Sequence, residues 1–393
     1  MFVGITNEAR DYAWGGVGAI SRLFGRPASH APEAELWLGA HHGSPSRVID
    51  PGAPDAAAST DLAEWIATDP TKHVGAHHNG RLPFLLKVLA AGGPLSLQAH
   101  PTTAQAEAGF ARENAAGIPL DAPNRSYKDP HAKPELILAV SETFDALCGF
   151  RPVADTREVL ERMIGLSHEH PEEQRAITRM LDRLDGDESI RATFAWLLSR
   201  ATGVDDVIAA VSHVAGRSAG GFAVQAELAE LYPGDPGIVI SLMLHQVTLN
   251  KGEALYLPAG NIHAYLHGVG IELMEASDNV LRGGLTPKHV DVAELLSVLD
   301  FMPRSAPYLI PEVPVPDVRV FRPDGASFEL IEFEGDGPCP LDGPAIALCV
   351  AGSFTITGAS SVTLGRGEAV YVTPDEGDLT VTGTGQLVVA TTV

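Results

Sequence analysis

The amino-acid sequence predicts a mainly β protein that contains an α-helical insertion and two barrels of the jelly-roll type. Strand-like runs occupy both ends of the chain, helical spacing with charged faces is confined to the middle, and one strand-and-turn pattern occurs twice. The expected division is a first, catalytic barrel over residues 1–150 and 236–309, a helical insertion over 151–235 and a C-terminal barrel over 310–393.

Length and composition indicate a globular chain of several domains. The 393 residues exceed one ordinary core, and 45% hydrophobic with 20% charged residues excludes a disordered chain. No run of eighteen apolar residues occurs, and the first residues lack a basic segment before an apolar one, so we expect a cytoplasmic protein without membrane contact. Cys148, Cys339 and Cys349 show no C-x-x-C spacing and are expected to be reduced and buried.

The formal charge of −23 argues against nucleic-acid binding, because phosphates would be repelled over most of the surface. The same charge does not exclude a small anionic ligand, which a few converging Lys and Arg side chains can bind. A functional site for such an anion therefore has to be sought as a local group of residues.

Residues 1–93 are expected to form irregular β structure, because Gly and Pro are frequent there. The segments Tyr12–Gly16 and Glu35–His41 combine Trp with Gly, as expected for the wall of a barrel. Residues 81–89 predict a buried strand that contains one cation, Lys87. Two interpretations of Lys87 stay open: a lysine that extends to solvent at a strand end, or one that faces a substrate.

The stretch Leu95–Pro101 is the centre of the predicted site. Ser96, Gln98 and His100 alternate with apolar residues, which places the three polar side chains on one face of a strand. An amide and an imidazole that face a barrel interior need partners, and a metal ion satisfies both. The alternative is a half-buried histidine on an edge strand.

Pro101, Thr102 and Thr103 predict the start of a helix that extends through Asn114. Glu135 heads the next apolar run, where it is either a solvated strand end or an anionic partner for the amide and imidazole. The helices expected in the insertion, which show no catalytic signature, lie at 155–164, 172–184, 188–198 and 222–232.

At Gly237 the chain is expected to return to β structure, with one strand over 238–249. The pattern that follows, Lys251–Pro258, recurs at Arg366–Pro374 as a Gly-Glu-Ala turn, a short strand and a proline, which is typical of a hairpin in a cupin-type jelly roll. Only the first copy continues into a histidine, His263, and no histidine follows His289. The C-terminal barrel therefore cannot hold an imidazole-bound metal.

The candidate metal ligands are Gln98, His100, Glu135 and His263. Two neutral imidazoles, one carboxylate and an amide oxygen suit a borderline divalent ion, above all Zn²⁺. With one anionic ligand, such a centre keeps about one net positive charge and can stabilise an oxyanion.

Charged residues are concentrated just beyond the last of these ligands. Two carboxylates, Glu272 and Asp278, precede Arg282 in a glycine-containing segment, and Lys288 follows. A solvated loop of mixed charge would give the same composition. Close to a metal-binding histidine, however, the cluster indicates a place where an anionic substrate is bound and protons are moved.

Four motifs together closely resemble the type I mannose-6-phosphate isomerases, and the resemblance extends over the whole chain in order. The motifs are Leu95–Pro101, Lys133–Glu135, Gly260–Tyr265 and Glu275–Lys288. The resemblance implies that Gln98, His100, Glu135 and His263 are the ligands of one zinc ion and that Arg282 is catalytic. It also implies a substrate pocket lined by Lys87, Lys133, Tyr265, Glu272, Asp278 and Lys288.

The activity implied by this resemblance is the interconversion of mannose 6-phosphate and fructose 6-phosphate through a cis-enediol, by a chain expected to be a monomer. Zinc and Arg282 would stabilise oxygen charge, Lys87, Lys133 and Lys288 would hold phosphate, and Glu272 and Asp278 are the carboxylates expected to move protons. One departure concerns Lys133: many members carry Asn-His before it, whereas this chain carries His131-Ala132.

Two other classes of protein remain as alternatives at this point. A non-catalytic protein of two barrels would bind a sugar or a partner without turning it over. An Fe²⁺ oxygenase would use His100, His263 and Glu135 as a facial triad. The Arg and Lys cluster and the fourth, amide ligand favour the isomerase.

Overall fold

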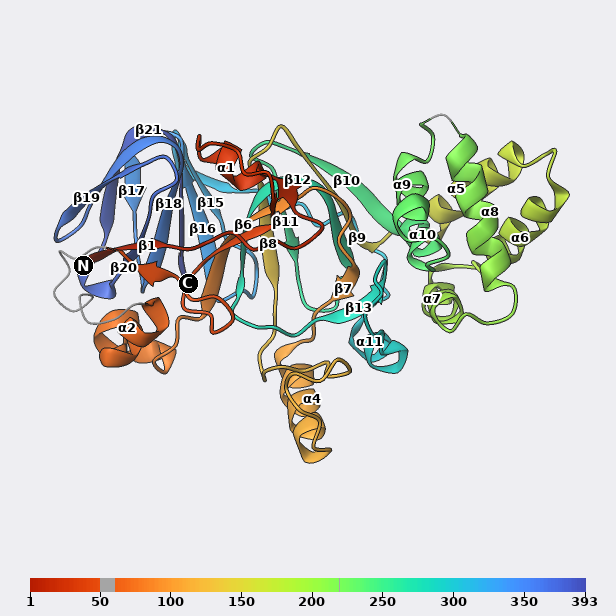
Figure 1. Cartoon of the computed structure of the whole chain (residues 1–393), viewed down its shortest axis with the longest axis horizontal. Helices are drawn as coiled ribbons and strands as arrows, with labels where there is room; N and C mark the ends of the chain where they lie inside the picture. Colours follow the sequence, from red (N-terminus) through yellow and green to blue (C-terminus); the bar gives the residue numbers. More distant parts are fainter. Residues whose placement is uncertain (50–60, 219) are drawn as a thin grey trace.

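The structure is a computed structural model that describes residues 1–49, 61–218 and 220–393. Within these residues, two large antiparallel sheets lie beside each other and a helical unit packs against the first sheet (Figure 1). The prediction of a mainly β protein that also contains helices is confirmed. None of the helices in the described ranges has the length and apolar character that crossing a bilayer requires.

The nine-stranded sheet, which we call the central sheet, carries the predicted site. Its described strands are β4 (Glu35–Leu38), β6 (Phe84–Ala91), β7 (Leu97–Ala99), β8 (Glu135–Ala139), β9 (Thr143–Phe150), β10 (Leu244–Asn250), β11 (Ala254–Leu257), β12 (His263–Glu275) and β13 (Leu281–Gly284). The long strand β12 pairs with β6, β7, β8 and β9, so it connects most of the segments that supply site residues.

Most strands of the ten-stranded sheet, which we call the C-terminal sheet, are drawn in blue in Figure 1, and its strand β1 is red. Its described strands are β1 (Phe2–Thr6), β5 (Arg47–Val48), β14 (Glu312–Val315), β15 (Val318–Phe321), β16 (Phe328–Phe333), β17 (Gly337–Cys339), β18 (Ala345–Thr357), β19 (Ser361–Gly365), β20 (Ala369–Val372) and β21 (Leu379–Thr392). A separate pair is formed by β2 (Gly16–Val17) and β3 (Pro32–Glu33). Among the described residues, strand pairs do not join the two edges of either large sheet.

Helices cover the outside of the sheets and form the insertion. The described α-helices are α1 (Ala19–Leu23), α2 (Leu62–Thr68), α3 (Pro70–Val74), α4 (Thr103–Ala115), α5 (Val153–Leu166), α6 (Pro171–Leu181), α7 (Ile190–Leu198), α8 (Val204–Arg217), α9 (Ala223–Leu231), α10 (Gly237–Ile240) and α11 (Val292–Val298). The 3₁₀ turns are η1 (Ala76–His78), η2 (Asp187–Ser189), η3 (Ser241–Met243) and η4 (Pro374–Glu376).

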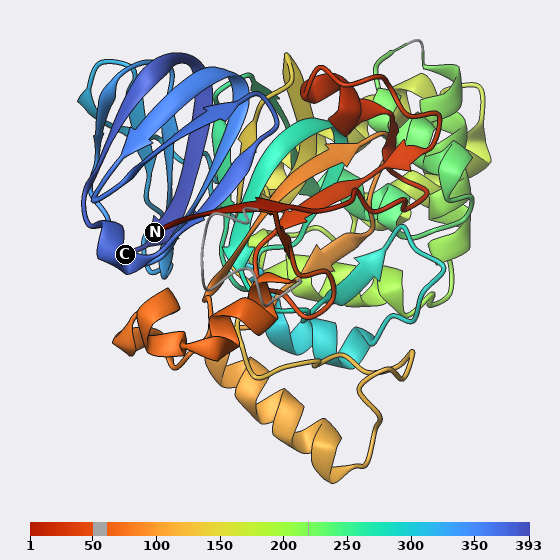
Figure 2. The same ribbon diagram turned by 60° about the vertical axis from the view of Figure 1, so that its left-hand side comes forward.

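The first strand of the chain lies in the C-terminal sheet. β1 pairs with β20 over Phe2–Ile5 and with β5 on its other side. Figure 2 shows the N-terminal segment leaving the blue sheet and crossing toward the central sheet. Residues 1–150 were assigned to the first barrel as one block. The division of the chain into domains stays a prediction, and this pairing would move its first strand to the C-terminal part.

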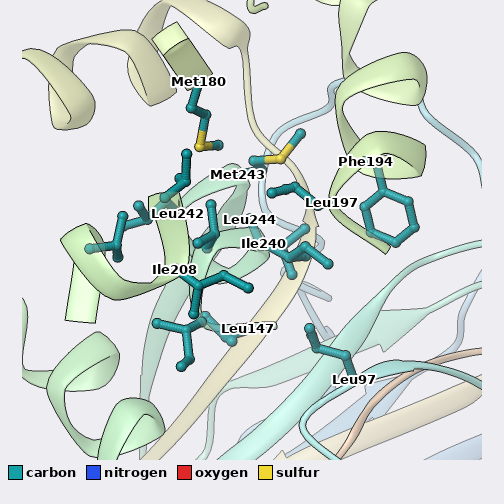
Figure 3. Close-up of a cluster of buried hydrophobic side chains, with 14 of the residues drawn as sticks. Leu97, Leu147, Met180, Phe194, Leu197, Ile208, Ile240, Leu242, Met243 and Leu244 are labelled. Carbon is teal, nitrogen blue, oxygen red and sulfur yellow. The ribbon is translucent and has the colours of Figure 1, made fainter. Parts of the chain in front are cut away.

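The insertion is held by an apolar core that it shares with the central sheet. Helical residues such as Phe194 and Ile208 pack in one buried cluster with Leu97 of β7 and Leu147 of β9 (Figure 3). The apolar faces of these helices therefore serve packing, because their residues lie in a core made by the helices and the sheet. A second cluster joins the two sheets, and a third lies almost wholly within the C-terminal sheet.

Two secondary-structure predictions need correction. The apolar run that begins at Ile238 is not a strand until Leu244, because it first forms α10 and η3. These residues are buried in the shared core, and an all-apolar run has no periodicity by which a strand can be told from a buried helix. The helix α8 was not predicted, nor were α1, α2 and α3 within residues 1–93.

Other local predictions are confirmed. The helix predicted after Pro101 is α4. The Thr102 hydroxyl caps it by accepting a hydrogen bond from the Gln105 backbone N–H, and the Gln105 side-chain oxygen accepts one from the Thr102 backbone N–H. Because the start of α4 is capped in this way, the direction of the chain directly after His100 is fixed. The three cysteines are free and buried.

Candidate active site and metal centre

Three strands, β7, β8 and β12, bring the predicted metal ligands together, and His100 follows directly after β7. Gln98 lies on β7 opposite His263, the first residue of β12, and Glu135 is the first residue of β8. His100 Nε2 lies 3.1 Å from Glu135 Oε1, and His263 Nε2 lies 3.2 Å from Glu135 Oε2. All three side chains are only 1% exposed. The structure therefore places two imidazoles against one buried carboxylate.

The hydrogen bonds behind the rings prepare both imidazoles to bind a cation. His100 Nδ1 lies 2.7 Å from the carbonyl oxygen of Asn279, and His263 Nδ1 lies 3.1 Å from that of Asn261. A carbonyl accepts only, so Nδ1 carries the proton in each ring and the lone pair is on Nε2. Within the described residues, His100 Nε2 is buried without a hydrogen-bond partner, which is costly unless an ion occupies the site.

The spacing of the ligand atoms fits a tetrahedral zinc centre. The amide nitrogen of Gln98 lies 3.3 Å from His263 Nε2, and rotation of the amide puts its oxygen in the same place. Ligand atoms at zinc bond lengths of about 2.0–2.1 Å are separated by about 3.3–3.4 Å in a tetrahedron. His100, Glu135 and His263 each offer one ligand atom, and these three atoms all lie within 4.8 Å of one another. The chemistry and the geometry of the residues fit the ion.

A cleft with a volume of about 740 Å³ lies beside this cluster, a size suited to a small ligand. Its lining includes one metal-ligand candidate from β7 and another from β8, together with every predicted substrate or catalytic residue: Lys87, Gln98, Lys133, Glu135, Tyr265, Glu272, Asp278, Arg282 and Lys288. The structure thus brings into one cavity all of the predicted site residues except the two histidines, which lie buried behind its wall.

Lys87 is fixed between two carboxylates in the cleft. Its Nζ lies 2.9 Å from Glu272 Oε2 and 3.4 Å from Glu35 Oε1, and the Trp37 ring lies 4.9 Å away. Burial disfavours the charged lysine, but Glu272 and Glu35 outweigh it and raise the pKa of the ammonium above its ordinary value. A lysine that extends to solvent is excluded, because the side chain is only 6% exposed.

Glu272 shares this environment. Burial raises the pKa of its carboxyl above the ordinary value, and Lys87 opposes that shift. The two residues are direct partners across β6 and β12, so the ion pair follows from strand register. Glu272 is therefore held in one place by the sheet and by Lys87.

The environment of Glu135 keeps its carboxylate in the ionised form. Burial opposes its ionisation, but Lys133, at 2.8 Å, and His100 hold the pKa of Glu135 well below its usual range. Tyr265 donates a hydrogen bond of 3.5 Å to its other oxygen. Burial and the neighbouring carboxylates raise the pKa of Tyr265 well above its usual value, so the phenol stays protonated and can donate.

Within the described residues, Arg282 and Lys288 line the cleft without a carboxylate ion-pair partner, as does Lys128, whose ammonium donates to the carbonyl of Leu120. Burial lowers the pKa of Arg282, and burial together with Arg282 lowers that of Lys288, as expected for two adjacent cations. A salt bridge from Arg282 to Asp278 is not formed. Arg282 is instead the partner of Gln98 across β7 and β13.

Sequence reasoning missed the residues that hold the segment Ser277–Asn279. Asp129 accepts hydrogen bonds from the Ser277 hydroxyl and from the Asp278 backbone, and Asn279 accepts from the backbone of Lys128. Because the Asn279 carbonyl also contacts His100, this network orients a candidate ligand. The only sequence feature that points to this network is an Asn within a polar segment, and that feature does not indicate which residues the Asn contacts.

His131, from the departure noted in the sequence, does not enter the cleft. It lines two smaller cavities, whereas its neighbour Ala132 is buried beside the strand that begins with Glu135. The imidazole of His131 therefore takes no place near the candidate ligands, and the chain presents a methyl group at the position that precedes Lys133.

Comparisons with known proteins point to one family. Residues 2–153 match the family model of the phosphomannose isomerase type I catalytic domain. The chain is 38% identical over 392 residues to the mannose-6-phosphate isomerase of Escherichia coli K12, covering 98% of this chain and 97% of that protein. It is 31% identical over 410 residues to the human mannose-6-phosphate isomerase, covering 93% of this chain and 92% of that protein.

Solved structures show the same fold. A phosphomannose isomerase variant from Salmonella typhimurium superposes with a TM-score of 0.87 at 33% identity, covering 100% of this chain and 99% of that chain. A zinc-bound mannose 6-phosphate isomerase gives a TM-score of 0.87 at 34% identity, with the same coverage.

Proposed function

The chain belongs to the family of type I phosphomannose isomerases, and we propose that it interconverts mannose 6-phosphate and fructose 6-phosphate with one bound zinc ion per chain. The observation that carries this proposal is the buried pair of imidazoles against Glu135 at a cleft whose wall holds Arg282 and Lys288. The cluster suits a Lewis acid, and the adjacent cations suit a phosphate.

Gln98, His100, Glu135 and His263 would hold the zinc ion. When bound, zinc supplies a positive charge that polarises oxygen atoms of the sugar. Glu135 is kept ionised by Lys133, so the only anionic ligand of the set is ready at neutral pH. Lys133 also closes one side of the cluster and can direct a sugar hydroxyl toward it.

Arg282 and Lys288 are proposed to bind the negative charges of the substrate. Three lysines are candidates for the phosphate, but Lys87 and Lys133 already pair with carboxylates at 2.9 and 2.8 Å. Lys288 lies beside Arg282 and is the more exposed cation, which suits a phosphate at the cleft entrance. Arg282, the cross-strand partner of the candidate ligand Gln98, would stabilise the enediolate oxygen.

We assign movement of the proton between the two sugar carbons to Asp278 and the fixing of Lys87 to Glu272. A proton carrier has to approach the substrate and change its charge. Glu272 is 3% exposed and bound to a lysine, whereas Asp278 lines the cleft, its side chain is 34% exposed, and it has no Lys or Arg partner in the described chain. The cis-enediol path requires one carrier that serves both carbons from one face of the sugar.

The finer architecture belongs to the same proposal. We infer that each large sheet is a cupin-type jelly roll, supported by the repeated hairpin, and that residues 151–235 are an insertion between two parts of the first one. A monomer in the cytoplasm, without nucleic-acid or membrane partners, remains our expectation for the chain.

A coupled assay with mannose 6-phosphate under anaerobic conditions, joined to elemental analysis, tests the proposal. We expect about one zinc per chain, turnover without oxygen, loss of turnover on chelation, and recovery with zinc. Iron in place of zinc, together with oxygen consumption, would instead support an oxygenase with a facial triad. A protein that binds the sugar phosphate but never converts it would support a non-catalytic binder.

A further inference from the structure

We infer that His41 is a positioning residue that fixes the carboxylate of Asp278 in the cleft. The inference rests on the proposed function, because it concerns the carboxylate to which we assign proton transfer. His41 follows β4 by three residues and lies far from Asp278 in the sequence, and His41 Nε2 lies 3.5 Å from Asp278 Oδ1. No motif in the sequence relates the two residues.

The His41 ring is built into the wall beside the cleft. Its side chain is only 4% exposed, the Trp37 ring meets it edge-on with the ring centres 5.1 Å apart, and the His42 ring stacks on it at 4.5 Å. Trp37 is itself held by a hydrogen bond from its indole nitrogen to Glu35, which also contacts Lys87. His41 and His42 line a smaller neighbouring cavity, and packing against Trp37, which lines the cleft, sets the position of the His41 ring.

The hydrogen bond behind the ring decides what His41 can offer. The backbone N–H of Gly43 donates to His41 Nδ1 over 3.1 Å. An N–H donates only, so Nδ1 carries the lone pair and the ring proton is on Nε2, the atom that faces Asp278. Burial lowers the pKa of His41 to about 4, so the neutral ring with this tautomer is the form at neutral pH. His41 thus presents a neutral N–H donor to the carboxylate.

His100 and His263 carry the ring proton on Nδ1, whereas His41 carries it on Nε2, so the two groups of histidines are suited to different roles. His41, His42 and Asp278 offer three ligand atoms within 4.8 Å of one another, as the main cluster does. In the main cluster both Nδ1 atoms face carbonyl oxygens, which leaves Nε2 free to bind a metal. At His41 a donor faces Nδ1, and Nε2 holds the proton. A metal ion at this place would have to displace the Nε2 proton of His41. Its second imidazole ligand would be His42, whose side chain is 81% exposed.

Asp278 has a fixed backbone but few restraints on its side chain. Its N–H donates to Asp129, which fixes the main chain, whereas the carboxylate contacts only imidazoles and no Lys or Arg among the described residues. Of the two imidazoles, His42 is solvent-exposed and His41 is buried, so His41 is the one that can restrict the carboxylate to one orientation. A proton carrier that serves two adjacent carbons requires that restriction.

Paired substitutions in the zinc-loaded enzyme test the inference. His41→Gln keeps an amide N–H near the place of Nε2, whereas His41→Asn is too short to reach Asp278. We expect His41→Asn to lower kcat by about 10- to 100-fold with little change in KM and in zinc content, and His41→Gln to recover much of the loss. His42→Asn should change kcat by less than about fivefold, because that ring is exposed.

A double-mutant cycle separates the inference from the proposed function. If His41 acts through Asp278, His41→Asn combined with Asp278→Asn should be no slower than Asp278→Asn alone. If Asp278→Asn keeps full activity, the assignment of Asp278 in the proposed function is wrong. If Asp278→Asn is slow while His41→Asn is not, or if the two losses multiply, only the positioning role is overturned.

Metal analysis covers the remaining alternative. The positioning role predicts one zinc per chain in the wild type and in all His41 and His42 variants. A second equivalent of zinc that is lost from both His41→Asn and His42→Asn would overturn the inference in favour of a second metal site. Equal losses in His41→Asn and His41→Gln, with a lowered melting temperature in both, would reduce His41 to a packing residue.

Discussion

The two copies of the Gly-Glu-Ala hairpin have the same local structure and different consequences. In the central sheet, Glu253 accepts a hydrogen bond of 2.7 Å from the backbone of Asn250. In the C-terminal sheet, Glu368 does the same for Gly365, also at 2.7 Å. Each copy turns at a glycine in the left-handed region, Gly252 at φ +85° and Gly367 at φ +81°, a conformation that glycine adopts without strain.

The copies diverge after the short strand. β11 leads through Gly260 into His263, which lies against Glu135, whereas β20 leads into η4, where Glu376 accepts hydrogen bonds from Ser360. The same hairpin therefore precedes a candidate metal ligand in one sheet and a turn-capping carboxylate in the other. The comparison teaches that the hairpin is scaffold and that function depends on the residues that follow it.

The largest effect is expected from removing the imidazole that distinguishes the copies. His263→Ala should abolish both zinc retention and turnover, because it removes a buried ligand and leaves Glu135 without one of its partners. Elemental analysis and the coupled assay measure the two losses. His245→Ala, a partly exposed histidine on β10, is the matched control and should keep both. Full zinc content in His263→Ala would show that the site lies elsewhere.

The second-largest effect is expected from Arg282, which lies in the central sheet. Arg282→Ala should keep the fold and the zinc ion but lower kcat by about 10²- to 10³-fold, or roughly 2.7 to 4 kcal/mol of transition-state stabilisation. The C-terminal sheet offers no counterpart beside a metal ligand. Substrate affinity should fall much less. If kcat is unchanged and only KM rises, Arg282 binds phosphate and the catalytic role must be reassigned.

A core substitution in the C-terminal sheet should separate stability from turnover. Leu387 is fully buried in the cluster that lies almost wholly within this sheet, so Leu387→Ala should lower the free energy of unfolding by about 2–5 kcal/mol. Turnover per folded molecule should stay nearly constant. Thermal melting and an assay corrected for the folded fraction measure these two quantities. Normal melting with lost catalysis would contradict a purely structural role for this sheet.

The smallest effect concerns the carboxylate in the second copy. Burial opposes ionisation of Glu376, but its hydrogen bonds from Ser360 hold the pKa below the ordinary value of 4.5. A depressed pKa contributes stability above the unfolded value that is lost as pH falls through the folded value. Glu376→Gln should therefore cost about 1 kcal/mol at pH 7, and the difference from wild type should shrink below pH 4.5. A difference that is constant down to low pH would contradict this.

The sequence by itself determined the features that depend on short spacing. The alternation in Leu95–Pro101 indicated that Gln98 and His100 lie together, Pro101 and the two threonines after it indicated the start of α4, and the repeated hairpin indicated which copy could carry His263. Strand periodicity, helix caps and turns are local, and their residues lie within a few positions of one another. The helical insertion was predicted for the same reason, apart from α8.

Only the tertiary structure decided which distant residues meet. It placed β1 in the C-terminal sheet, made the apolar run after Ile238 helical within the shared core, and put Lys87 between Glu35 and Glu272. It also brought His41 to Asp278 and turned His131 away from the cleft. Strand order and packing set these contacts, and a side chain carries no local signal of the partner that a different strand will supply.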